Sequence, residues 1–168
     1  MIEEKLLWEN EGQSTLVFIV LGGSGTRRHE GMRGFDATAA YFWLRGHSCY
    51  VNRIIEGGDE QHKVPSPKQT LDNCKKSLTA LTERLSTSQI VLYGSSAGGM
   101  IATFLARTTE KVSGVVIWET LPRFTETKQE MIAESERKGM TLSDTFMEEI
   151  LHAADAAPDV SCPALILH

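Results

Sequence analysis

Residues 94–98 read Gly-Ser-Ser-Ala-Gly, and their types and spacing suit nucleophilic catalysis better than any other part of the chain. A serine hydroxyl is a weak nucleophile near neutral pH. An enzyme that uses one must expose it beside a base and beside donors that stabilise an oxyanion. The glycines two positions before and after Ser96 allow a bend so tight that side chains there would clash. The motif therefore predicts Ser96 as the nucleophile of an acyl transfer.

The sequence on either side of the motif supports this interpretation. The apolar run 90–93 precedes it and reads as a buried strand, and the small and apolar residues 97–106 follow it and read as a helix. The first N–H groups of a helix lack intrahelical acceptors, and the helix dipole places its positive end there. We therefore expect the N–H of Ala97 to be one donor to the oxyanion of a substrate bound at Ser96.

A second Gly-rich segment, Gly-Gly-Ser-Gly at 22–25, follows the apolar run 16–21. Small residues let the backbone approach a substrate closely, so the N–H of Gly23 or of Ser24 is the expected second oxyanion donor. The structural alternative for both Gly-rich segments is a turn that only connects a strand to a helix.

The remaining elements indicate how these turns are positioned. Apolar runs alternate with amphipathic segments, a pattern typical of an α/β protein with a mostly parallel sheet and helices on both faces. We expect strands at 16–21, 49–55, 90–93, 112–118 and 163–167, and a short antiparallel strand at 6–9. We expect helices at 35–45, around the apolar positions of 71–85, at 97–106, at 122–138 and at 142–154.

The composition excludes several function classes. A chain of 168 residues suits one domain, and a net charge of -5 disfavours nucleic acid and anionic membranes as partners. No apolar run is long enough to span a membrane. The three cysteines are far apart in the sequence, which fits the reducing cytoplasm, and no set of side chains has metal-binding spacing.

On the segments 21–25 and 94–99, the chain resembles the α/β-hydrolase family, in its esterase, lysophospholipase and serine-aminopeptidase-like branch. The resemblance covers nearly the whole chain. It implies a serine hydrolase that cleaves an ester, thioester or amide bond of a small-molecule acyl substrate and needs no cofactor. It also implies that 122–154 is a lid-like helical insertion into the single domain 1–168.

The end of the sequence departs from this family's pattern. The family's acid usually follows the strand that begins here at Pro163, and its histidine follows one strand later, before a last helix. The sequence ends at His168, so we expect an incomplete domain, from a fragment or a truncated gene product, whose base and acid lie beyond residue 168. Strand 163–167 would then be an exposed apolar edge, which predicts poor solubility or self-association and puts activity in doubt.

Other residues fit the roles of base and acid less well. His168 ends a strand expected two places from the nucleophile strand, about 10 Å to the side, so it reads as a strand-end residue. His29 follows the Gly-rich turn, and Glu119 follows the strand beside the nucleophile strand, where some relatives of the family carry their acid.

Two further functions stay open. The chain could be a non-catalytic hydrolase homologue that binds a ligand or partner. Residues 20–27, Val-Leu-Gly-Gly-Ser-Gly-Thr-Arg, also resemble the turn with which sugar-phosphate nucleotidyltransferases hold phosphates, but that function leaves the serine motif unexplained.

Overall fold

The computed structural model describes residues 7–22, 31–52, 66–118, 128–137 and 160–167, together with the single positions 145 and 148. The strands are β1 (Leu7–Trp8), β2 (Thr15–Val20), β3 (Ser48–Asn52), β4 (Gln89–Ser95), β5 (Val112–Trp118) and β6 (Ala164–Leu167). The helices are α1 (Gly31–Trp43), α2 (Pro67–Arg84), α3 (Ala97–Thr108) and α4 (Lys128–Arg137). None of these helices combines the length and the apolar character needed to cross a membrane.

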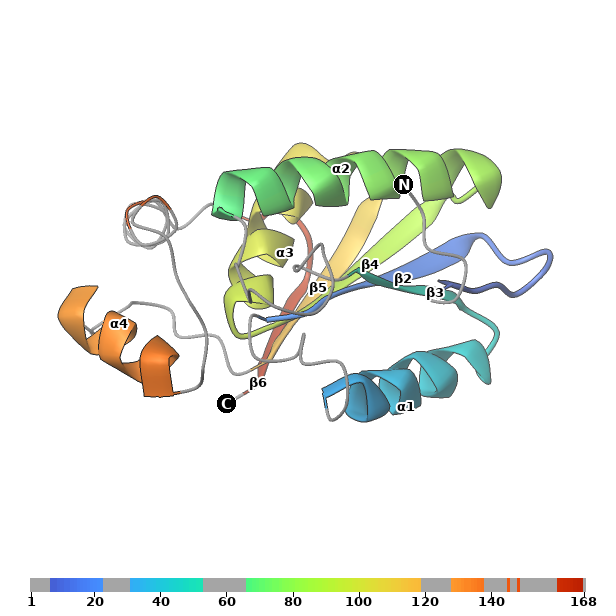
Figure 1. Ribbon diagram of the computed structural model, residues 1–168. Coiled ribbons are helices and arrows are strands. Elements are labelled where there is room, and N and C mark those ends of the chain that lie inside the picture. The colour runs from blue at the N-terminus through green and yellow to red at the C-terminus, as the bar shows by residue number, and fades with distance from the viewer. Residues whose placement is uncertain are drawn as a thin grey trace.

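The strands form one six-stranded sheet in the order β1-β3-β2-β4-β5-β6 (Figure 1). β1 pairs antiparallel with β3, and all other neighbours are parallel. The carboxyl ends of the parallel strands therefore meet at one edge of the sheet, where open α/β sheets bind their ligands. β4 lies near the middle of that edge. The prediction of a mostly parallel sheet is confirmed.

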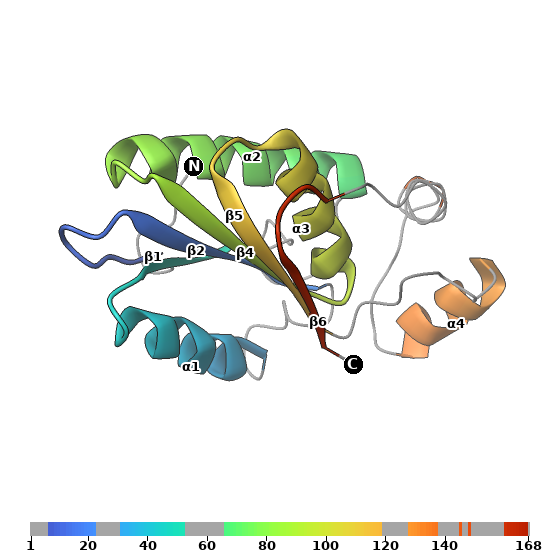
Figure 2. The ribbon, with the colours of Figure 1, turned by 180° about the vertical axis from the view of Figure 1, so that it is seen from behind.

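Helices cover both faces of the sheet (Figures 1 and 2). α2 and α3 lie on one face, where α3 packs against β4, β5 and β2. α1 lies on the other face and packs against β3, β2 and β1. Both faces of β2 are thus covered, and its residues 16–20 are all buried. This burial is the physical reason why the strand reads as a continuous apolar run in the sequence.

Two hydrophobic clusters fill the space between the layers. The larger one joins the sheet to α2 and α3 and contains Phe18, Leu78 and Leu105. The smaller one, on the face of α1, contains Ile19 and Tyr93. Residues of β4 contribute to both clusters, so β4 is packed against a helical layer on each face of the sheet.

The structure differs from the sequence prediction mainly at the ends of elements. α1 begins at Gly31 instead of residue 35, since the two glycines at 31 and 34 are poor helix formers that gave no helical signal. β3 is described as far as Asn52, and residues 53–55 of the expected strand lie outside the described part. Of the expected lid, the structure describes α4 and helical positions 145 and 148. The lid itself stays a prediction.

Candidate active site

Ser96 occupies the turn between β4 and α3, at the carboxyl edge of the sheet, and its residue is exposed. Its backbone has φ 51° and ψ −130°, a combination that a residue with a side chain rarely adopts. Such strain persists only where the surrounding structure over-determines it, and it is concentrated at functional sites. The contacts of Ser96 must therefore maintain this conformation.

Hydrogen bonds hold the strained turn from two sides. The N–H of Ser96 donates to the carbonyl of Trp118, the last residue of β5, over 3.0 Å. The N–H of Gly99 donates to the carbonyl of Ser96 over 2.9 Å, which closes the first turn of α3. The turn of residues 94–98, called the elbow below, is thus fixed both to the neighbouring strand and to the helix that follows it.

The glycines of the motif are required because three elements meet at the elbow. A Cβ at Gly94 would collide with the carbonyl oxygen of Gly98 and would lie 2.6 Å from the Cα of Gly99. A Cβ at Gly98 would collide with the carbonyl oxygen of Val20, at the end of β2. Both glycines thus let the backbones of β2, β4 and α3 approach to contact, which explains their spacing around Ser96.

Gly22 lies directly beside the Ser96 side chain. A Cβ at position 22 would lie 2.7 Å from the Cβ of Ser96 and 3.3 Å from its Oγ. The chain that leaves β2 therefore passes within contact distance of Ser96, as a second oxyanion donor from this turn requires. Gly23 and Ser24, the residues predicted to supply that donor, lie outside the described residues.

Ala97 is the first residue of α3, immediately after Ser96. The N–H groups of a first helical turn have no acceptor within the helix, and the positive end of the helix dipole is concentrated there. The N–H of Ala97 therefore belongs to the helix end that adjoins Ser96. Ala97 thus adjoins Ser96 at the amino end of α3, and its role as an oxyanion donor stays a prediction.

The described residues contain one histidine, His47, and it lies far from the elbow in the fold. His47 immediately precedes β3, so it lies at the amino edge of the parallel sheet, opposite the edge that carries Ser96. His29, His168 and Glu119 lie outside the described residues. His47 is therefore excluded as a base for Ser96 by its position.

The thiols are poor alternative nucleophiles. Cys49 and Cys74 are completely buried, and this burial raises the pKa of each from its ordinary value of 9.0 to about 12. The Sγ of Cys74 also accepts a hydrogen bond from the side-chain amide of Asn52 at 3.1 Å. Both side chains are thus neutral packing groups at physiological pH. Within the described part of the chain, no group of three or more His, Cys, Asp and Glu side chains could hold a metal ion.

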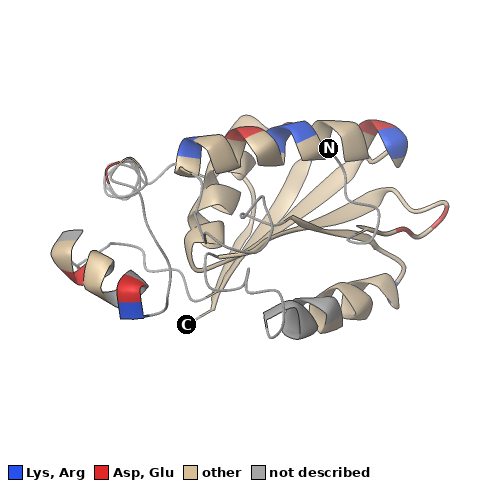
Figure 3. Ribbon diagram, viewed as in Figure 1, with Lys and Arg blue, Asp and Glu red and all other residues tan. Residues whose placement is uncertain are grey.

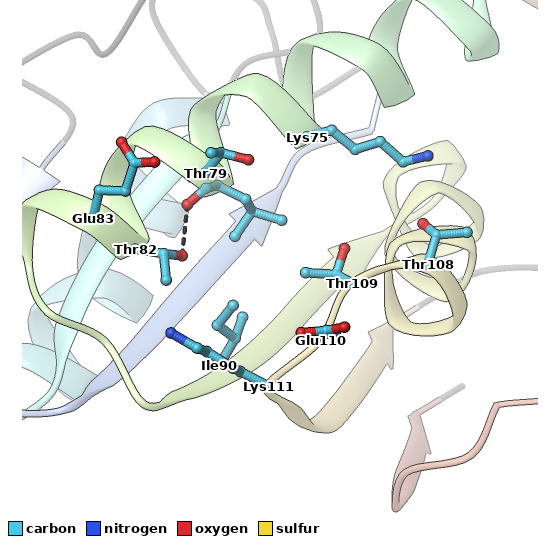
Figure 4. Close-up of a pocket in the computed structure, with 10 residues that line it drawn as sticks. Lys75, Thr79, Thr82, Glu83, Ile90, Thr108, Thr109, Glu110 and Lys111 are labelled. Atoms are coloured by element: carbon cyan, nitrogen blue, oxygen red, sulfur yellow. Dashed lines mark hydrogen bonds between the residues drawn. The ribbon is translucent and has the colours of Figure 1, made fainter.

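A groove of about 400 Å³ lies away from the elbow, between α2 and α3 (Figure 4). It lies at the amino ends of β4 and β5, where Ile90 and Lys111 line it. Its wall on α2 includes Thr82, whose hydroxyl donates to the carbonyl of Leu78 at 2.7 Å. The groove therefore lies at the edge of the sheet opposite Ser96 and is no part of the candidate active site.

No protein-family model matches the sequence, and no curated protein matches it in sequence. Solved structures do match. One is that of a metagenome-derived lipolytic enzyme of the pair LipS and LipT, with a TM-score of 0.70 and 15% identity over 99% of this chain and 76% of that one. Another is Est1E from Butyrivibrio proteoclasticus, bound to ferulic acid, with a TM-score of 0.69 and 15% identity over 96% of this chain and 72% of that one. A third is GrgF, an α/β hydrolase from Penicillium sp. sh18, with a TM-score of 0.60 and 14% identity over 93% of this chain and 72% of that one.

These matches cover at least 93% of this chain. At such low identity they establish the arrangement of the elements and leave the chemistry to be argued from the site. With its sheet order, its single antiparallel strand and its strained serine between β4 and α3, the chain has the α/β-hydrolase fold.

Proposed function

We propose that the chain is a serine hydrolase that cleaves an ester, thioester or amide bond through an acyl-enzyme on Ser96. One observation carries the proposal. Ser96 combines exposure with a strained backbone, φ 51° and ψ −130°, that hydrogen bonds to β5 and α3 maintain. A plain connection between a strand and a helix needs no such strain, whereas a nucleophile that must project from the sheet edge does.

In this proposal Ser96 Oγ attacks the substrate carbonyl, and the leaving group departs to give the acyl-enzyme, which water then cleaves. The N–H of Ala97 and that of Gly23 or Ser24 stabilise the oxyanion. The contact of Gly22 with Ser96 supports this pairing, since it brings the Gly-rich turn to the nucleophile. The base and the acid come from outside the described residues, and no cofactor takes part.

The similar structures suggest the substrate class. They include a lipolytic enzyme and Est1E with bound ferulic acid, so a small carboxylic ester is the substrate to test first. α4 lies beyond the carboxyl edge of the sheet, on the side of the elbow (Figures 1 and 2). This placement supports the proposal that 122–154 forms a lid over the substrate. The buried, unpaired thiols of Cys49 and Cys74 support a reducing compartment, the cytoplasm, as the site of action.

The test is the hydrolysis of 4-nitrophenyl butyrate by the chain, extended to include the base and the acid that are expected beyond residue 168, and by two serine variants of the same protein. We expect Ser96→Ala to lower the rate by at least about 10³-fold. Ser95→Ala is the matched control, because Ser95 is the adjacent hydroxyl but ends β4 with an ordinary strand pairing to Trp118, and it should retain most of the rate. Equal rates for the parent chain and Ser96→Ala would contradict the proposal.

One observation favours a second candidate, a non-catalytic homologue that binds an acyl ligand. His47, the histidine within the described residues, lies at the opposite edge of the sheet from Ser96, so the described residues do not themselves supply a base, and a binding function is the alternative to test. A chain that binds a carboxylic ester in calorimetry without turning it over would have this function. The nucleotidyltransferase alternative leaves the contact between Gly22 and Ser96 unexplained.

A further inference from the structure

Asn52 is a buried polar residue at the carboxyl end of β3, at the same edge of the sheet as Ser96. Only 5% of its surface is accessible. Val20, which lies opposite Asn52 on β2, and Tyr50, two residues earlier on the same face of β3, both belong to the larger hydrophobic cluster. Burying an amide among apolar side chains costs free energy unless its polar atoms are hydrogen-bonded. The role of Asn52 must therefore be sought in its hydrogen bonds.

The side chain of Asn52 is bonded to α2. Its Nδ2 donates to the Sγ of Cys74 at 3.1 Å, and Cys74 is completely buried. The strands β2, β3 and β4 carry no charged residue, and none of the charged residues of α2 is buried (Figure 3). A hydrogen bond in such an uncharged interior is electrostatically stronger than the same bond in water. The bond therefore holds the end of β3 against α2.

The backbone of Asn52 is bonded to the chain that leaves β2. Its carbonyl accepts the N–H of Leu21 at 3.4 Å, which continues the parallel pairing of Val20 with Asn52 one residue beyond β2. The next residue is Gly22, where an added Cβ would lie 2.7 Å from the Cβ of Ser96. The end of β3 is therefore connected to the nucleophile through Leu21 and Gly22.

The other end of β3 carries a comparable polar side chain. Ser48 is 1% exposed, and its Oγ accepts the N–H of Asn10 at 3.0 Å and donates to the carbonyl of Asn10 at 3.4 Å. Ser48 begins β3, so it lies at the amino edge of the sheet, opposite Ser96. Ser48 and Asn52 are thus both buried and hydrogen-bonded on one strand, and only Asn52 adjoins the candidate active site.

We propose that Asn52 is a positioning residue that holds the turn after β2 at the distance from Ser96 at which an N–H of the turn reaches the oxyanion. This inference rests on the proposed hydrolase function. Cys74 takes part as the acceptor that fixes the Asn52 side chain, and not as a nucleophile. The oxyanion develops in the transition state, so a misplaced donor lowers kcat and leaves KM almost unchanged.

Steady-state hydrolysis of 4-nitrophenyl butyrate, by the chain extended beyond residue 168 as in the test above, measures this effect. Asn52→Leu should lower kcat at least about tenfold and change KM less than about twofold, because small shifts of a group at the reacting centre are costly. Ser48→Ala is the matched control. It also removes a buried hydrogen-bonding group from β3 and lowers stability, but it should retain kcat.

A second pair of variants covers the case that Asn52→Leu does not fold. Cys74→Ser keeps an acceptor for the amide and should retain kcat within about twofold. Cys74→Ala removes the acceptor and should lower kcat at least about threefold. Adding Cys74→Ala to Asn52→Leu should cause no further loss, since both changes remove the same bond.

Hydrogen exchange of the Leu21 N–H, followed by NMR, tests the positioning without catalysis. Asn52→Leu and Cys74→Ala should each raise its exchange rate at least about tenfold, and Ser48→Ala should change it less than about twofold. Equal kcat values for Asn52→Leu and Ser48→Ala, or an unchanged Leu21 exchange rate in Asn52→Leu, would overturn the inference. A parent chain no more active than Ser96→Ala would instead contradict the proposed function, and the exchange of Leu21 would then decide whether Asn52 holds the turn.

Discussion

Ser96 has φ 51° and ψ −130°, a backbone conformation that costs an L-residue on the order of 1–3 kcal/mol. The cost is offset by bonds from its N–H to Trp118 and from Gly99 to its carbonyl. The residue types of the motif were sufficient to predict the bend and its two glycines. They could not reveal that a third glycine, Gly22, contacts the serine, because that contact depends on how β2 and β4 pair.

Gly22→Ala tests the contact between the turn after β2 and the nucleophile. The added Cβ would lie 2.7 Å from Ser96 Cβ and 2.8 Å from the carbonyl oxygen of Ser95, so the serine or the turn must shift. A shift of about 1 Å at a reacting group costs about 10²-fold in rate, and we expect that loss in the acylation rate of Ser96. Gly114→Ala is the control, since its Cβ would lie 3.7 Å from the carbonyl oxygen of Pro163, an ordinary contact. Equal rates for both variants would contradict the assigned geometry.

The buried thiols predict how stability depends on pH. Burial raises the pKa of Cys49 and Cys74 to about 12 in the folded chain, whereas the thiols of the unfolded chain ionise near 9.0. Above pH 9 the thiols ionise in the unfolded chain but stay neutral in the folded chain. The unfolded state is therefore favoured increasingly as the pH rises from about 9 toward 12. The free energy of unfolding in urea should therefore fall through this range, by about 1.4 kcal/mol per pH unit for each thiol. Cys74→Ala should reduce that slope by half, and an unchanged slope would count against the role of the thiols.

Ser96 lies where the ends of β2, β4 and α3 meet. The strand before Ser96 and the helix after it were both predictable. Residues 90–93 form a short apolar run, whereas 97–106 is a longer run of small and apolar residues. The neighbours of β4 on the side of β5 and β6 were predicted, and the order confirms them. The pairing of β2 with both β4 and β3 was not predicted, since it is set by packing between distant segments. The start of α1 was also missed, because Gly31 and Gly34 suppress the helical signal.

The amino end of α2 offers a test of an element boundary. The Oγ of Ser66 accepts a hydrogen bond from the N–H of Gln69 at 3.2 Å, and Pro67 begins the helix. Ser66→Ala should lower the free energy of unfolding by about 1 kcal/mol. Ser66→Gly should lower the free energy of unfolding by only about a few tenths of a kcal/mol, because glycine is a much better N-cap residue than alanine. Urea unfolding followed by circular dichroism measures both, and an unchanged free energy of unfolding in Ser66→Ala would show that the cap contributes little.

At the scale of the whole molecule, the sheet is unevenly covered. α2 and α3 pack on one face, whereas α1 packs on the β1, β3 and β2 part of the other. The exposed apolar edge expected from the sequence is present in β6, where Leu165 and Ile166 are more than half exposed.

The proposed function requires that Ser96 is an activated nucleophile. Reaction of the chain with a fluorophosphonate probe, followed by peptide mass spectrometry, tests this most directly. We predict one adduct per chain, on Ser96, that is lost in Ser96→Ala and retained in Ser95→Ala. Unfolding in urea before the reaction should abolish it, because the bonds to Trp118 and within α3 maintain the geometry. An adduct on Ser95, on several serines equally, or on none would contradict the assignment of Ser96.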